Sequence, residues 1–219
     1  MKKIISLSLT VILILSLLAV FSGCGSVSTD GLLEEAKVLI EKSVLFNEIY
    51  YGEGIPYQIM SKPAIGNYYY ADEAYLEKNG FKTIGELKEK TAEVFSSGYC
   101  AELYVLGFSG FSSANGFVNA RYSSNQAENL RDENEKLLVY KDIEPTVKGT
   151  TTYDFSSMSI VETGADYAYV MLNTTVFYPA TEEKEAYSED YELEIRFVYE
   201  RVTGCGGYDI GWRIDTPTY

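Results

Sequence analysis

From residue 151 onward, apolar residues recur at every second position, and this alternation constrains the fold more than any other sequence feature. Residues 151–162, 167–178 and 191–199 are predicted strands, and a glycine-rich turn then leads into a last strand that ends near Ile214, on which Trp212 is expected to be buried. A period of two gives each strand one buried face and one wet face. Short turns between such strands predict an antiparallel meander.

The first half of the chain carries helical spacing instead. Apolar residues three and four apart predict a helix over 30–51, with Asp30 as its N-cap. Residues 83–86 form a capping box, and the helix that they open is expected to run to about Ser97, whereas the glycine- and serine-rich segment 107–116 is expected to be a loop. Helices followed by strands favour an α+β fold, with N-terminal helices packed on a curved antiparallel sheet that ends in a C-terminal β-meander.

The first 24 residues have the layout of an export signal. Lys2 and Lys3 precede a largely apolar run over residues 4–21, which the small residues Ser22 and Gly23 follow. This run is short, and its flanks are those of a secretory signal rather than of a permanent membrane-spanning helix. We therefore expect the protein to be exported.

The end of this segment indicates how the protein is held. Phe21-Ser22-Gly23-Cys24 resembles the bacterial lipobox, which implies that Cys24 carries a lipid and becomes the N-terminus of the mature chain. The alternative is an ordinary secretory signal with an incidental cysteine. We thus predict a lipoprotein signal peptide over 1–23, a flexible tether over 24–30 and a single α+β domain over 31–219, either compact or two-lobed.

Composition excludes several classes of function. The 219-residue chain has no histidine, so it has no Ser-His-Asp or Cys-His catalysis and no histidine-ligated metal site. Its net charge of −14 argues against a nucleic-acid partner, because phosphate binding requires clustered lysine and arginine. The segment 107–116 lacks the spacing of a phosphate-binding loop. The sequence therefore predicts no cofactor, no metal and no nucleic acid as ligand.

Tyrosine supplies the candidate ligand-binding residues. Among the 20 tyrosines of the chain, Tyr68, Tyr69 and Tyr70 are consecutive and cannot all point inward, whereas most others reflect the preference of tyrosine for strands. Acidic residues cluster over 182–194, which indicates either a solvated segment that leads into a strand, or a cation site or negative docking surface. No single pair of acids is selected as catalytic, and no catalytic residue is assigned.

Cys100 and Cys205 are the other two cysteines of the chain. An exported protein can form a disulfide between them, and the alternative is two unrelated buried thiols. A catalytic thiol is not expected, because no imidazole is available to activate it.

Two family resemblances follow from these patterns. The last strand pair with Gly211-Trp212-Arg213-Ile214 resembles the close of nuclear transport factor 2-like (cystatin-like) domains, in which helices pack in a curved antiparallel sheet. The order of a long first helix, a tyrosine-rich segment, Phe81–Lys88 and the late Gly211-Trp212-Arg213 strand resembles the DL-endopeptidase inhibitors of bacterial envelopes. That resemblance implies a two-lobed protein that covers the active sites of cell-wall endopeptidases.

The expected function is therefore that of a membrane-anchored lipoprotein on the extracytoplasmic face of the cell membrane. It would act without catalysis, as a binding or regulatory module for an envelope protein or a cell-wall component, and one form of this role is inhibition of cell-wall endopeptidases. The alternative is a carboxylate-dependent envelope hydrolase, since glycoside hydrolysis needs only two carboxylates.

Replacing Cys24 with alanine tests the predicted anchor. In a lipoprotein-processing bacterium, the wild-type chain should incorporate labelled fatty acid such as palmitate and partition into detergent, because two acyl chains suffice for stable membrane attachment. The Cys24→Ala chain should lose both properties. Equal labelling of the two chains would contradict lipidation at Cys24.

Overall fold

The computed structural model describes residues 27–58, 62–113, 116–125, 135–146, 149–181, 184–204 and 207–219. The predicted signal peptide and Cys24 lie outside these residues. The helices are α2 (Leu32–Tyr50), α3 (Glu73–Asn79), α4 (Ile84–Ala92), α5 (Ser97–Tyr104) and the π-helix η1 (Val105–Ser109). The strands are β1 (Tyr68–Tyr70), β2 (Phe111–Ser113), β3 (Gly116–Val118), β4 (Tyr122–Ser124), β5 (Leu137–Tyr140), β6 (Thr150–Thr163), β7 (Tyr167–Tyr178), β8 (Tyr187–Gly204) and β9 (Gly207–Ile214).

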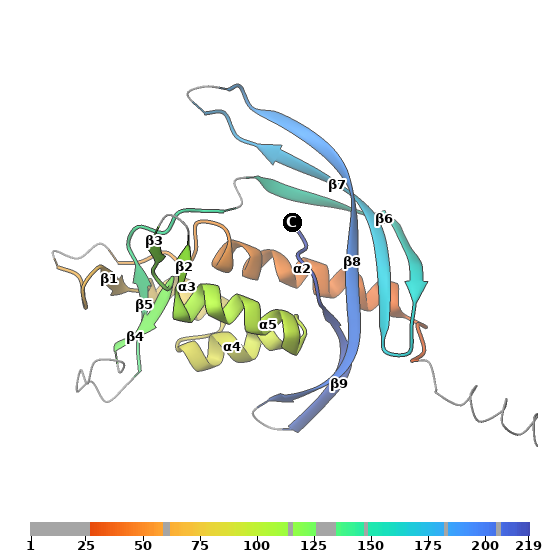
Figure 1. The fold of residues 1–219 in the computed structure, drawn as a ribbon, viewed down its shortest axis with the longest axis horizontal. Helices are drawn as coiled ribbons and strands as arrows, with labels where there is room; N and C mark the ends of the chain where they lie inside the picture. Colours follow the sequence, from red (N-terminus) through yellow and green to blue (C-terminus); the bar gives the residue numbers. More distant parts are fainter. Residues whose placement is uncertain are drawn as a thin grey trace, which may run out of the picture.

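The C-terminal strands form an antiparallel meander in the order β6-β7-β8-β9. The sheet curves around α2, as Figure 1 shows. On β7 the side chains of Val170 and Leu172 are buried and that of Asn173 is exposed, as the predicted alternation requires. This arrangement confirms the predicted α+β class, with its helices first and a C-terminal antiparallel meander.

α2 occupies the concave side of this sheet. Its buried stripe includes Leu32, Leu39, Phe46 and Tyr50, which recur at helical spacing and join the hydrophobic core. Trp212 on β9 belongs to the same core and is 3% exposed, which confirms the expectation that it is buried. α2 is the longest described helix, and neither it nor any other described helix has an apolar stretch that could cross a bilayer.

A smaller sheet, in the order β1-β5-β4, lies beyond the C-terminal end of α2 (Figure 1). Both of its strand pairs are antiparallel, and α3, α4 and α5 lie beside it. Leu137 and Val139 on β5 and Tyr122 on β4 join the same hydrophobic core as α2 and the large sheet. The two larger sheets of the described residues therefore share one core.

The helix that begins at the capping box is shorter than predicted. Thr83 and Glu86 form the capping box as expected, but α4 ends at Ala92. After a turn at Glu93 and Val94 the chain pairs with the last strand, because Ser96 N donates to Ile214 O at 2.8 Å and Ile214 N donates to Val94 O at 3.0 Å. These long-range backbone bonds compete with helix continuation, and a second helix, α5, begins at Ser97 with Ser96 as its cap.

Two further local predictions were wrong. The segment 107–116 is not a loop throughout, since it contains the end of η1 and the first strand of the β2-β3 hairpin. The N-cap of α2 is Gly31 rather than Asp30, because φ of 76° at Gly31 turns the chain into the helix. Residues 27–30 are the described part of the predicted tether, and at its end Val27 N donates to Ala165 O at 3.1 Å and the Val27 side chain packs against the core.

The C-terminal segment is fastened to α2 by Thr218, which is fully buried. Its hydroxyl bonds with the Ser43 hydroxyl at 2.7 Å and accepts from Asn47 Nδ2 at 2.8 Å. Tyr153 on β6 also donates its hydroxyl to the Thr218 carbonyl, at 2.5 Å. This polar cluster joins helix, sheet and C-terminus.

Thr218→Val should lower the free energy of unfolding by about 1–3 kcal/mol, because it leaves the buried Ser43 and the half-buried Asn47 without their shared hydroxyl. Urea unfolding followed by Trp212 emission measures the change, since the chain has one tryptophan. Thr152→Val is the matched control on an exposed β6 position and should shift stability by less than about 0.5 kcal/mol. Equal stabilities of the two variants would contradict the role of Thr218.

Candidate functional site

A groove of about 700 Å³ lies between the smaller sheet and the α3–α4 segment. Its apolar lining consists of Ala71, Leu76 and Leu137, which are 3%, 6% and 2% exposed. Ala71 follows β1, Leu76 lies on α3 and Leu137 begins β5, so three separate elements meet there. The groove size falls within the range of small-molecule sites.

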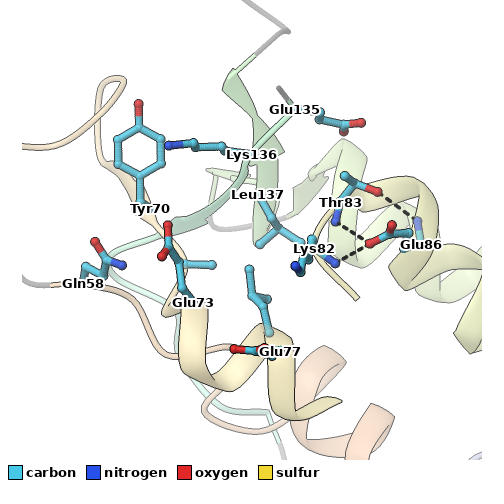
Figure 2. A pocket seen from close by; sticks show the side chains of 12 residues that line it. Gln58, Tyr70, Glu73, Glu77, Lys82, Thr83, Glu86, Glu135, Lys136 and Leu137 are labelled. Carbon is cyan, nitrogen blue, oxygen red and sulfur yellow. Dashed lines mark hydrogen bonds between the residues drawn. The ribbon is translucent and has the colours of Figure 1, made fainter. Parts of the chain in front are cut away.

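Polar groups surround this apolar lining, as Figure 2 shows. The ammonium of Lys136 lies 5.4 Å from the centre of the Tyr70 ring, a cation–π distance. Gln58 stands beside Tyr70, whose carbonyl accepts from Gln58 N at 2.9 Å. An aromatic ring, an amide and an ammonium thus border one side of the groove.

Four carboxylates also line the groove, those of Glu73, Glu77, Glu86 and Glu135. Glu86 Oε2 accepts from the backbone amides of Lys82 at 2.5 Å and Thr83 at 3.3 Å, so this carboxylate caps α4. In Figure 2, Glu73 points toward Gln58 and Tyr70, Glu77 lies one turn further along α3, and Glu135 lies at the far rim. A hydrolytic pair requires two carboxylates that face a common substrate bond, and Figure 2 draws none of these four facing another.

The three consecutive tyrosines do not form one site. They make up β1, and a strand sends alternate side chains to opposite faces. Tyr70 lines the groove, whereas Tyr68 donates its hydroxyl to Ala120 O at 2.8 Å and packs edge-on against Tyr140. Partial burial raises the pKa of Tyr68. Tyr69 packs instead against Tyr57, with ring centres 5.1 Å apart.

The sequence did not select the other groove residues. Glu73 and Glu77 are four apart and therefore share one side of α3, which is a recognisable pattern but a common one on solvated helices. Lys136 gains its position only through the pairing of β5 with β1, where Tyr70 opposes Leu138. No local signal identifies such a long-range neighbour.

Cys100 is a buried, free thiol on α5, and it donates to Phe95 O at 3.6 Å. Burial raises the pKa of this thiol to about 11. Its candidate disulfide partner, Cys205, lies outside the described residues. A protonated, buried thiol is a poor nucleophile.

The acidic segment 182–194 runs into β8, which begins at Tyr187. Glu189, Asp190, Glu192 and Glu194 lie on this strand and are exposed. Within the described ranges, no group of three or more histidine, cysteine or acidic side chains is arranged to hold a metal ion.

Comparison with known proteins identifies no relative. No family model, no curated protein and no solved structure matches the chain.

The raised pKa of Cys100 predicts low reactivity in the folded protein. At pH 9 an ordinary thiol is about half ionised, whereas a thiol with a pKa of about 11 is about 1% ionised. In a Cys24→Ala/Cys205→Ala chain, iodoacetamide should therefore alkylate Cys100 at least about 50-fold more slowly in buffer than in denaturant, as followed by mass spectrometry. Similar rates in both conditions would show an accessible thiolate.

Proposed function

We propose that this protein is a lipid-anchored, extracytoplasmic binding module of the cell envelope that acts without catalysis. The observation that carries the proposal is the groove itself: an apolar lining bordered by Tyr70 and Lys136, with carboxylates spread around it rather than paired. Such a surface can orient a ligand through several weak polar contacts. The binding role is favoured over the alternative, a carboxylate-dependent envelope hydrolase, because the carboxylate of Glu86 is already occupied in capping α4.

The position of the predicted anchor supports this proposal. Cys24 is three residues before Val27, whose amide bonds to the turn between β6 and β7. The elements that line the groove, β1, α3 and β5, lie toward the opposite end of α2 in Figure 1, and this helix of 19 residues is about 28 Å long. A lipid on Cys24 would thus hold the β6–β7 turn toward the membrane and leave the groove on the side away from it.

The groove chemistry favours a cell-wall glycopeptide as ligand. A sugar can stack on the Tyr70 ring, while Lys136 and the carboxylates of Glu73 and Glu77 complement the carboxylate and ammonium groups of a peptide stem. Inhibition of a cell-wall endopeptidase is the regulatory form of the same proposal. The resemblance to the endopeptidase inhibitors supports it, as does the acidity of the chain, which suits a basic enzyme surface.

Titration with soluble muropeptides tests the proposal. The full-length protein in detergent should bind them without converting them, with binding measured by calorimetry and products sought by mass spectrometry. Tyr70→Ala should weaken binding about tenfold, because it removes the aromatic face of the groove. Tyr187→Ala is the matched control, since Tyr187 is 39% exposed on β8 and does not line this groove.

Two results would overturn the proposal. Equal weakening by Tyr70→Ala and Tyr187→Ala would remove the groove as the binding site. Muropeptide cleavage that disappears on replacing Glu73 or Glu77 with glutamine would favour the hydrolase instead.

A further inference from the structure

The outer edge of β8 is unpaired over half of its length. β7 pairs with β8 from Tyr187 to Val198, whereas β9 pairs with β8 only from Phe197 onward. Among the described residues, no strand therefore borders residues 187–195 on the side of β9. Unpaired strand edges expose backbone donors and acceptors that can pair with another chain.

The C-terminal segment leaves this edge free because it turns away from the sheet. Asp215 N donates to Arg196 O at 2.8 Å, and Arg196 N donates to the Thr216 hydroxyl at 3.1 Å, which ends the ladder. Pro217 follows and has no amide hydrogen to continue it. Thr218 is then fastened to Ser43 on α2.

Side chains along the free edge alternate between acidic and apolar or aromatic from Asp190 to Ile195. One face of the strand carries three carboxylates, those of Asp190, Glu192 and Glu194. Their partners in the β7 register are Thr175, Asn173 and Met171. Thr175 donates its hydroxyl to the Asp190 carboxylate at 2.7 Å. The opposite face carries Tyr191 and Leu193. Leu193 packs against the core. Tyr191 is 45% exposed and donates its hydroxyl to the Glu189 carboxylate. Every residue from 187 to 192 is exposed.

A cavity of about 410 Å³ lies beneath the edge and is lined by Tyr191, Leu193, Val176 and Tyr178. An apolar side chain from an added strand would enter this space. On the other face, no lysine or arginine of residues 187–195 offsets the charge of the three carboxylates. Arg196, the next cation along β8, forms an ion pair with Asp215.

We propose that residues 187–195 bind an extended, basic segment of a partner protein, which adds to the sheet as a further strand beside β8. Lysine or arginine at alternate positions of that segment pairs with Asp190, Glu192 and Glu194, and the apolar residues between them face Tyr191 and Leu193. Backbone hydrogen bonds supply affinity, and the alternation of side chains supplies specificity. The inference deepens the proposed binding function and rests on it for the presence of an envelope partner.

Charge excludes a second copy of this chain as the occupant. Two such edges side by side would bring carboxylates against carboxylates, and like charges on adjacent strands are destabilising. Acidic residues on an exposed edge therefore oppose self-pairing, while they favour a strand of opposite charge.

A fluorescein-labelled octapeptide with alternating lysine and valine is the probe, and fluorescence polarisation with full-length protein in detergent is the measurement. Saturable binding that weakens with salt is expected. Glu192→Gln/Glu194→Gln should weaken it about fivefold, because two exposed charge pairs are lost. Glu41→Gln/Glu102→Gln, an equal charge change at exposed positions of α2 and α5, should leave it unchanged.

Two further peptides distinguish strand addition from diffuse attraction. The same peptide with N-methyl groups along one edge keeps its charge but cannot complete the ladder, and it should bind at least tenfold more weakly. A peptide of the same composition with its four lysines in a block should also bind weakly. Hydrogen exchange of residues 187–195 should slow only with the alternating, unmethylated peptide.

Equal binding of the methylated or block peptide, or equal effects of the two double variants, would overturn the inference. Concentration-dependent dimerisation that protects the same residues would assign the edge to a second copy instead. The outcome is separable from that of the proposed function, because neither lipidation at Cys24 nor muropeptide binding in the groove is needed for the peptide to bind. Failure of the peptide with intact muropeptide binding would remove this inference alone.

Discussion

The arrangement of the molecule depends on how the carbonyl groups at the C-terminal end of α2 are capped. The last turn of this helix has no basic residue of its own. Arg121 supplies the cation from a distant part of the chain, and its guanidinium donates to Gly52 O at 2.9 Å and Glu144 O at 3.2 Å. The adjacent Tyr122 donates its hydroxyl to Ile49 O at 2.6 Å. Carbonyl groups at a helix end need such partners, and a positive charge there also suits the helix dipole.

This capping of α2 joins the smaller sheet, β1-β5-β4, to the large meander. Arg121 is 5% exposed and Tyr122 is fully buried, and burial lowers the pKa of the first and raises that of the second. Tyr122 begins β4, so its bond to α2 attaches the smaller sheet to the helix that fills the larger one. The groove and the free edge of β8 therefore belong to one connected structure, although they lie on different sheets.

Parts of the fold that depend on local chemistry could be predicted from the sequence. Thr83 and Glu86 form their capping box because both partners lie within one turn. The strands from Thr150 to Ile214 were predicted because their alternation reflects a single buried face. α4 was predicted too long for the opposite reason: Val94 and Ser96 bond to Ile214, more than a hundred residues away. The short hairpin of β2 and β3 was missed because glycine and serine carry little strand preference.

By itself, the sequence determined the α+β class, the meander and the burial of Trp212, because each follows from a repeat or a bond between near neighbours. Only the tertiary structure decided that Tyr70, and neither Tyr68 nor Tyr69, lines the groove. Alternation along β1 sends Tyr69 to the opposite face, whereas Tyr68 shares the face of Tyr70 but bonds to Ala120 O and packs on Tyr140. The pairing of β5 with β1 brings Lys136 beside Tyr70. It also decided that β8 keeps a free edge. Pro217 can be read from the sequence, but whether it directs the chain away from β8 depends on the hydrogen bonds of Thr218. Those bonds are to Ser43 and Asn47 on α2.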